Sequence, residues 1–285
     1  LYLIPAFIGL IVLTYIPLIA VFGLSFFKWG GTGAPEWNGI NNYIKLFTTD
    51  PYFKESIKVT VYFSLLAVVG SMVYSLIVAM LLNRKIPARG FFRAVFYLPY
   101  VLPAAAVYIG WSWLYNTEWG LFNYILSKLG IERLMFVSSS SQVVPSLALI
   151  AVWLSGNLIV IFLAGLQNVP RVYHEAAEID GANAWQRFWH VTFPSMTPII
   201  FYNMLMSLIT NMQVVTPALA LTKGGPGKSS YFMSYMLYNY AFKQRGKIGL
   251  ACAIAFVLFL LIGAFTLLLF ATSKSWIFYE GGDDK

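Results

Sequence analysis

Six long apolar stretches alternate with shorter polar segments along the chain. None of the six contains Asp, Glu, Lys or Arg, and they cover residues 1–27, 59–82, 94–115, 143–166, 195–222 and 248–272. An α-helix rises about 1.5 Å per residue, so roughly 20 apolar residues are enough to cross the hydrocarbon core of a bilayer. The pattern therefore predicts an all-α membrane protein with six transmembrane helices in a single domain over residues 1–285.

Three of these stretches carry prolines well inside them. Pro17 lies in the first, Pro99 and Pro103 in the third, and Pro198 and Pro217 in the fifth. Because a membrane helix tolerates proline where neighbouring helices satisfy the freed carbonyls, we expect packed, kinked helices there. The first stretch is too long for the core of a signal peptide and no small-residue cleavage site follows it, so a retained helix is expected. Since the sequence does not start with Met, we also expect residues to precede it.

Composition agrees with a membrane location and excludes several kinds of chemistry. Hydrophobic residues make up 59% of the chain and charged residues 11%, whereas a soluble domain has about 25% charged residues. The single cysteine, Cys252, lies in an apolar stretch, and His174 and His190 lack further ligands at metal-binding spacing. Neither a disulfide framework nor a metal site is therefore predicted. The net charge of +8 is spread over the segments between the stretches, which argues against a nucleic-acid-binding face.

The basic residues indicate which side of the membrane each loop faces. One short connection carries Arg84, Lys85, Arg89 and Arg93, and the positive-inside rule places it in the cytoplasm. Five basic residues between 223 and 247 favour the opposite orientation, so total counts do not decide. We give the dense, short connection more weight, and alternation of the helices then places residues 168–194 in the cytoplasm as well.

A polar segment before the fifth stretch, NVPRVYHEAAEIDGANAWQRFWHVTFP at 168–194, predicts a short amphipathic helix. Pro170 suits a first helical turn, and Gly181 suits the left-handed residue that ends a helix. Between them, helical spacing gives one charged face and one face with small apolar side chains. The first face contains Arg171, Glu175 and Glu178, and the second contains Val172, Ala176 and Ile179.

A second short helix follows. Asn183 and Gln186 have the spacing of a capping box, which predicts a helix over Ala184–His190. Two short helices with an acidic rim form a knob that suits a groove supplying arginines in another protein. A helix lying on lipid would explain the same pattern, but such helices usually carry Lys and Arg on the polar face, so docking is favoured.

Several motifs resemble the membrane subunits of ATP-binding-cassette (ABC) importers. The signature loop of that family is EAA, three residues, Gly, nine residues, an aliphatic residue, one residue, an apolar residue and Pro. Here it consists of Glu175, Ala176, Ala177, Gly181, Val191, Phe193 and Pro194, with Val and Phe where Ile and Leu are more common. The stretches GINNYIKLF at 39–47, FFRAVFYLPYVLP at 91–103, GLFNYILSKLG at 120–130 and LTKGGP at 221–226 resemble binding-protein-dependent sugar permeases of the maltose and glycerol-phosphate type.

The resemblance implies a type I importer permease fold with a cytoplasmic coupling helix at about 168–194. In that family this loop seats in a cleft of a separate ATPase subunit, with the residue equivalent to Glu175 near a basic residue there. The loop converts ATP-driven closure of the ATPase subunits into movement of the membrane helices. The residues expected to take part in coupling are Arg171, Glu175, Ala176, Ala177, Glu178, Asp180, Gly181 and Pro194.

The sequence assigns ATP hydrolysis to another chain. It lacks the GxxxxGK[ST] phosphate-binding loop, and GGPGK at 224–228 has the wrong spacing. We therefore expect a transport subunit without enzymatic activity or a cofactor of its own, with ATP and Mg bound by the partner ATPase. The resemblance implies two ATPase subunits, a second homologous permease forming a heterodimer, an extracytoplasmic sugar-binding protein, and a bacterial or archaeal cytoplasmic membrane.

Uncharged polar side chains in the fourth and fifth stretches are the candidates for contact with the cargo. Trp153 and Asn157 are four residues apart, as are Ser207 and Asn211, so each pair is predicted to share a helix face. An amide beside an aromatic ring suits a neutral, hydroxyl-rich ligand such as a di- or oligosaccharide. Hydrogen bonds to a neighbouring helix would explain the same side chains equally well. The full candidate set is Trp153, Asn157, Ser207, Thr210, Asn211 and Gln213.

Other functions stay open at this point. A glycerol 3-phosphate or polyol importer would share every motif above, although a dianion would favour a Lys or Arg in the pathway. A secondary transporter or a channel would need ionisable residues or a selectivity filter in the spans, and the apolar stretches carry no ionisable residue.

Two aromatic segments lie outside these motifs. WSWLYNTEW at 111–119 is placed to form an interfacial aromatic belt at the end of the third span. Residues 229–244 are aromatic and only moderately apolar, so we expect a helix near the outer surface that helps to receive the binding protein.

Overall fold

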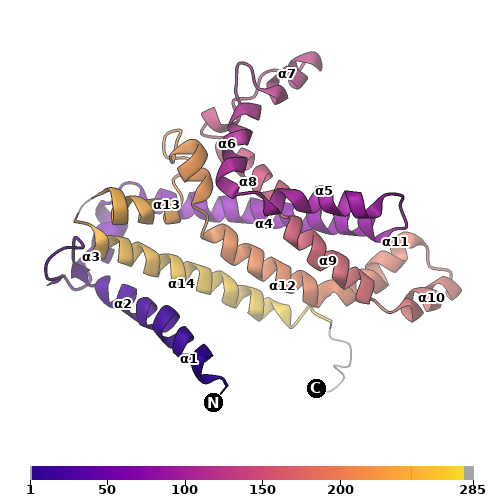
Figure 1. The fold of residues 1–285 in the computed structure, drawn as a ribbon, viewed down its shortest axis with the longest axis horizontal. Coiled ribbons are helices and arrows are strands. Elements are labelled where there is room, and N and C mark those ends of the chain that lie inside the picture. Colours follow the sequence, from indigo (N-terminus) through magenta and orange to yellow (C-terminus); the bar gives the residue numbers. More distant parts are fainter. Residues whose placement is uncertain (1, 245, 279–285) are drawn as a thin grey trace. The chain divides into compact units, whose positions relative to one another are not determined.

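The computed structural model describes residues 2–244 and 246–278. Helices dominate these residues (Figure 1), and the one sheet among them is a short antiparallel pair, β1 (Phe27–Lys28) with β2 (Glu36–Trp37). The chain divides into two compact units, one formed by residues 1–61 with 213–264 and the other by residues 62–212 with 265–285. Helix α4 (Phe53–Asn83) passes from the first unit into the second without interruption.

The first unit contains the two ends of the apolar pattern. Its N-terminal helix consists of α1 (Ile4–Leu10), a π-helical turn (Ile11–Tyr15) and α2 (Ile16–Leu24), followed by the sheet, α3 (Asn41–Ile44) and a π-helical turn (Lys45–Thr49). Its later part contains a π-helical turn (Ala218–Thr222), α13 (Met233–Tyr238), a π-helical turn (Asn239–Lys243) and most of α14 (Ile248–Ser273).

Close backbone packing joins these two parts of the first unit. A Cβ at Gly249, in the first turn of α14, would collide with the carbonyl oxygen of Phe27. The buried amide of Asn42 donates to the carbonyls of Ser25 (2.8 Å) and Phe27 (2.9 Å). Glycine is therefore required at position 249, because only the missing side chain allows the two backbones to approach.

The aromatic segment at 229–244 forms α13 and a π-helical turn, so the prediction of a helix there is confirmed. Two contacts hold it beside the start of α4: the Met233 N–H donates to Thr60 Oγ1 (2.9 Å), and the Tyr240 hydroxyl donates to the Asp50 carboxylate. Burial, together with this hydrogen bond to Asp50, raises the pKa of Tyr240 above its usual value.

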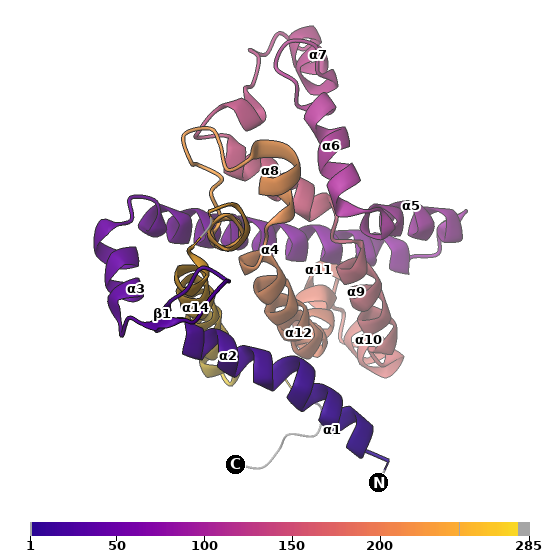
Figure 2. The same ribbon diagram turned by 60° about the vertical axis from the view of Figure 1, so that its left-hand side comes forward.

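The second unit contains the rest of α4 and the helices α5 to α12. These are α5 (Arg89–Val101), α6 (Ala104–Leu114), α7 (Leu121–Lys128), a 3-10 turn (Phe136–Ser138), α8 (Val143–Trp153), α9 (Gly156–Asn168), α10 (Arg171–Ile179), α11 (Ala184–Arg187), a π-helical turn (Phe188–Thr192) and α12 (Phe193–Met212). Helix α5 packs against α9, and Figure 2 shows α10 beyond the end of α9.

The core of the second unit lies where α4, α9 and α12 meet. Its buried side chains include Leu82, Phe162 and Met196. Two glycines allow α9 to pack closely on its neighbours. A Cβ at Gly156 would lie 2.9 Å from the Phe96 carbonyl oxygen of α5, and one at Gly165 would lie 3.0 Å from the Met196 sulfur of α12.

Two of the six predicted spans are bent helix pairs. Three helices among the described residues are long and apolar enough to cross a membrane (Ile4–Leu24, α4 and α14), and the count is five if α5 with α6 and α8 with α9 are each one span. The kink expected in the stretch at 94–115 is confirmed, since α5 and α6 bend by 100°, whereas the 49° bend between α8 and α9 in the stretch at 143–166 was not predicted. Pro103 explains the first bend, since it holds Leu102 extended and lacks an N–H to continue the helix.

The second bend and the fifth predicted span have different causes. The Ser155 hydroxyl donates to the Val152 carbonyl of its own chain (2.6 Å), and such local bonds compete with helix continuation. In the fifth stretch, α12 has 20 residues and ends at Met212, ten residues before the predicted boundary at 222. Its two prolines and two asparagines make it less apolar than the three long membrane-spanning candidates. A total of six spans stays a prediction.

Candidate functional site

Helix α10 begins after Pro170 and ends before Gly181, as the sequence predicts. Gly181 has a positive φ of 77°. Its N–H donates to the Glu178 carbonyl (3.0 Å), and the Ala182 N–H donates to the Ala177 carbonyl (2.9 Å). This is the Schellman pattern, in which glycine adopts the left-handed conformation at no steric cost.

The predicted capping box starts the second short helix. Asn183 Oδ1 accepts from the Gln186 N–H (3.0 Å), and Gln186 Oε1 accepts from the Asn183 N–H (2.8 Å). The predicted range Ala184–His190 is α11 followed by the first residues of a π-helical turn. We call residues 170–194, which hold both helices, the coupling knob.

An ion pair joins the two helices of the coupling knob. Glu178 near the end of α10 pairs with Arg187 at the end of α11. Arg187 was not among the predicted coupling residues, and Glu178 was predicted on a face that meets another protein. Together with the glycine turn and the capping box, the pair gives the knob a defined shape before any partner binds.

Most of the predicted coupling residues lie at the surface of the knob. Ala177 and Pro194 are half-buried, whereas the exposed set comprises Arg171, Glu175, Ala176, Glu178, Asp180 and Gly181. Large apolar side chains are exposed beside them, among them Ile179 (87% exposed) and Trp185 (69%). The predicted apolar face of α10 already contains Ile179, and Trp185 adds a large exposed side chain from α11 that was not predicted.

Aromatic contacts support the second half of the knob. The Trp185 and Trp189 ring centroids are 5.6 Å apart, and Trp189 lies 5.1 Å from both Phe188 and Phe193. Since Phe193 begins α12, this group connects the knob to that 20-residue helix.

Ser207 and Asn211 are the one predicted pathway pair that the structure brings together. The Asn211 side-chain amide donates to the Ser207 carbonyl (2.8 Å) and to Ser207 Oγ (3.1 Å). Ser207 is buried and Asn211 is half-buried. The amide oxygen of Asn211 accepts no hydrogen bond from the described residues, so it is available to a hydroxyl donor.

The other pathway candidates are not assembled into one site. The prediction that Trp153 and Asn157 share a helix face is wrong, because the two residues lie in different helices. Helix α8 ends at Trp153, and α9 starts at Gly156 on the other side of the bend. The Trp153 ring instead lies 5.6 Å from that of Trp111. Thr210 is exposed and donates to the Met206 carbonyl of its own helix (2.8 Å). Gln213 is exposed just past the end of α12.

Asn203 is a polar residue of α12 that was not among the predicted pathway residues. Its side chain is fully buried, and neither atom of its amide has a hydrogen-bond partner among the described residues. It lies four residues before Ser207 and eight before Asn211, and this spacing on one helix face was the signal that would have found it.

We expect Asn211→Leu to weaken cargo handling without harming assembly, because it removes the amide and keeps the side-chain volume. The apparent KM for uptake should rise about tenfold, which corresponds to about 1.4 kcal/mol of lost binding. The matched control is Asn203→Leu, which removes a buried unpaired amide and should raise the melting temperature. The measurement is uptake in proteoliposomes. An unchanged KM for Asn211→Leu would show that this side chain serves helix packing and does not contact the cargo.

Comparisons with known proteins agree with the fold. The family described as "Binding-protein-dependent transport system inner membrane component" matches residues 71–275. The chain is 36% identical over 284 residues to the probable ABC transporter permease protein YesP of Bacillus subtilis, covering 98% of this chain and 91% of that protein. It is also 36% identical over 277 residues to the multiple sugar-binding transport system permease protein MsmF of Streptococcus mutans, covering 96% and 94%.

An archaeal relative and a solved structure extend the comparison. The trehalose/maltose transport system permease protein MalF of Thermococcus litoralis is 29% identical over 268 residues, covering 93% of this chain and 90% of that protein. A bacterial ABC transporter that imports the acidic polysaccharide alginate has a chain with a TM-score of 0.81 at 20% identity, covering 96% of this chain and 93% of that chain. At this identity the likeness concerns the fold alone, and it confirms the predicted importer permease fold.

Proposed function

Because the chain belongs to the family of inner-membrane components of binding-protein-dependent transport systems, we propose that it forms a translocation pathway for a neutral di- or oligosaccharide. As a permease of this family the chain is a transport subunit and not an enzyme. The membrane we propose for it is the cytoplasmic membrane of a bacterium or archaeon.

The observation that carries the mechanism is the shape and exposure of the coupling knob. Its backbone is fixed by the turn at Gly181, the capping box and the Glu178–Arg187 pair, while Glu175 and Trp185 are exposed. A defined element with exposed charged and aromatic side chains suits a groove in another protein. We propose that this groove belongs to a separate ATPase subunit, which binds ATP and Mg.

The remaining partners follow from this assignment. In the proposal, the chain pairs with a second, homologous permease, and the pair rests on two ATPase subunits. A binding protein delivers the sugar from the other side, consistent with a fold neighbour solved with its periplasmic binding protein. The outward- and inward-facing states are then a two-state equilibrium that nucleotide and loaded binding protein bias from opposite sides of the membrane.

The nature of the cargo is inferred from the chemistry of α12 and from relatives named for sugar transport. The amide of Asn211 beside the Ser207 hydroxyl suits sugar hydroxyls, which both donate and accept hydrogen bonds. The solved neighbour imports an acidic polysaccharide, so an acidic cargo is the second candidate. A negatively charged cargo would favour a basic residue in the pathway, and the apolar stretches of this chain carry no Lys or Arg.

ATP hydrolysis by the whole complex tests this proposal. The complex would be purified with its partner chains, placed in lipid nanodiscs with its binding protein, and given maltose, trehalose, maltotriose, glycerol 3-phosphate or an alginate oligosaccharide. We expect hydrolysis to rise several-fold with one of the neutral sugars. A rise only with glycerol 3-phosphate or alginate would overturn the neutral cargo, and hydrolysis that no binding protein stimulates would overturn the coupling role.

A further inference from the structure

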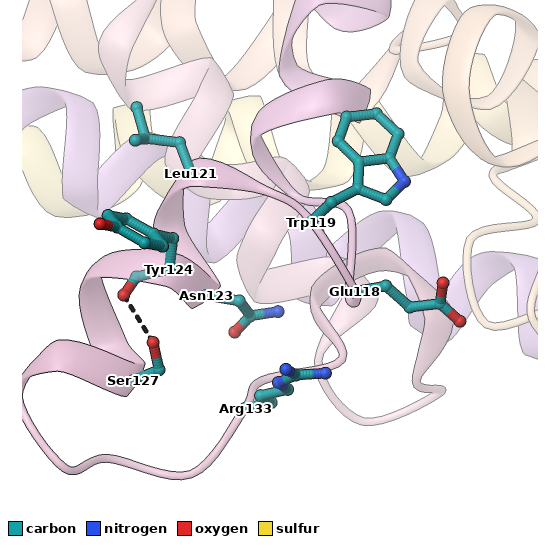
Figure 3. Close-up of a pocket in the computed structure, with 7 residues that line it drawn as sticks. All are labelled: Glu118, Trp119, Leu121, Asn123, Tyr124, Ser127 and Arg133. Carbon is teal, nitrogen blue, oxygen red and sulfur yellow. Dashed lines mark hydrogen bonds between the residues drawn. The ribbon is translucent and has the colours of Figure 1, made fainter.

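A cavity of about 400 Å³ lies in the segment that joins α6 to α8, within the second unit. This segment follows the α5–α6 pair, so alternation places it on the side of the membrane opposite the basic connection at 83–93. Figure 3 shows the side chains that line the cavity. They are Glu118, Trp119, Leu121, Asn123, Tyr124, Ser127 and Arg133.

One wall of the cavity is fixed by Asn116. Its Oδ1 accepts from the N–H groups of Glu118 (2.9 Å) and Trp119 (3.1 Å), which holds the backbone that carries these two side chains. A Cβ at Gly120 would collide with the Asn116 carbonyl oxygen, so this tight turn requires glycine. The turn therefore presents Glu118 and Trp119 in one defined arrangement.

The opposite wall is tied to the first by Asn123. This buried side chain donates to the carbonyls of Leu134 (2.9 Å) and Thr117 (3.2 Å) and accepts from the Leu134 N–H (2.9 Å). Leu134 follows Arg133 directly, so the same clamp sets the backbone position of Arg133 relative to the turn that carries Trp119. The cavity is thus formed by the fold of the segment before a ligand arrives.

The side chains that line the cavity are of the kinds that carbohydrate-binding sites use. Trp119 and Tyr124 are large aromatic side chains that are 63% and 60% exposed. Lys128 lies over the Tyr124 ring, 5.5 Å from its centroid, and restrains it. Within the described residues, Glu118 and Arg133 make no side-chain hydrogen bond or ion pair, so a carboxylate acceptor and a guanidinium donor remain free among the residues that line the cavity.

We propose that this cavity is a second carbohydrate site, which takes one or two sugar rings of a neutral oligosaccharide at the outer face of the permease. The apolar face of a sugar ring packs on Trp119, Glu118 accepts from hydroxyls, and Arg133 donates to hydroxyl oxygens. Its volume is at the small end of ligand pockets, which matches a short saccharide and a weak, exchanging site. The proposal rests on the proposed sugar transport and adds a site outside the membrane pathway.

The test is sugar binding to the whole complex in nanodiscs without binding protein, followed by saturation-transfer difference NMR with maltose, trehalose and maltotriose as probes. We expect at least a fivefold loss of transfer for Trp119→Ala. The matched control is Trp113→Ala, which removes a Trp of similar exposure on α6 that does not line the cavity. Glu118→Gln, which keeps the side-chain shape, should also lose transfer even if Trp119→Ala disturbs the local fold.

Each other outcome overturns the proposal. Equal saturation transfer to the sugar in Trp119→Ala and Trp113→Ala, or no saturation transfer to any of the three sugars, would show that the cavity is not a carbohydrate site. Weaker co-sedimentation of the binding protein with Trp119→Ala, with sugar transfer unchanged, would make the cavity a protein contact. Hydrolysis by the unmodified complex, measured after binding protein and sugar are added to the same preparation, separates these failures from a failure of the proposed cargo.

Discussion

Replacing Glu175 with Lys is expected to abolish most transport while leaving the protein inserted and assembled in the membrane. Glu175 is exposed on α10, so the folded chain loses little when its charge is reversed. A basic residue in the ATPase groove would instead face another positive charge. Placing like charges together at an interface costs several kcal/mol. Since about 1.4 kcal/mol corresponds to a factor of ten, uptake should fall at least about tenfold.

Uptake and hydrolysis measured on the same proteoliposomes check this result. Loss of uptake with residual, unstimulated hydrolysis would show that the ATPase subunits still work but no longer drive the permease. The matched control is Glu132→Lys, which makes the same charge change at an exposed site in the segment between α6 and α8. Normal uptake by Glu175→Lys, with normal stimulation by the binding protein, would contradict the proposed role of the coupling knob.

The coupling knob shows which features of this molecule can be predicted from its sequence. Gly181 and the Asn183–Gln186 pair act through neighbours within three or four residues, so their spacing alone defines the ends of the two short helices. The Glu178–Arg187 pair depends on how the chain folds back between those helices, and spacing along a single helix does not reveal it. Local signals therefore predicted the elements of the knob, and missed the contact that joins them.

The membrane helices show the same division. Apolar length located three long helices and two bent helix pairs, and Pro103 marked a kink, but the 100° size of that bend depends on tertiary packing. The bend after Trp153 had no proline signal, because it arises where Ser155 bonds its own backbone and Gly156 lies against α5. The outer cavity was missed for a similar reason. Its walls meet through the bonds from Asn123 to Leu134, eleven residues away, so Trp119 was assigned to an interfacial belt instead.

Reversing the charge of Arg187 is expected to impair coupling, and reversing both partners of its ion pair is expected to restore it. The Glu178 side chain is 61% exposed, and exposed pairs contribute about 0.2–1 kcal/mol to stability. Arg187→Glu should therefore scarcely change the melting temperature of the complex. It places two carboxylates where the structure brings opposite charges together, so α10 should separate from α11 and the knob should lose its shape.

We expect Arg187→Glu to lower uptake about fivefold to tenfold, because a displaced contact at a working interface costs about 1 kcal/mol or more. The double variant Glu178→Arg with Arg187→Glu keeps an opposite-charge pair at the same place and should recover at least half of the uptake. Glu178→Arg alone should fail like Arg187→Glu. Recovery in the double variant would show that the two side chains contact each other within the knob. If each side chain instead contacted the ATPase directly, the two changes together would impair uptake at least as much as either change alone. If the double variant is as defective as the singles, Glu178 faces the partner chain and not Arg187 during transport.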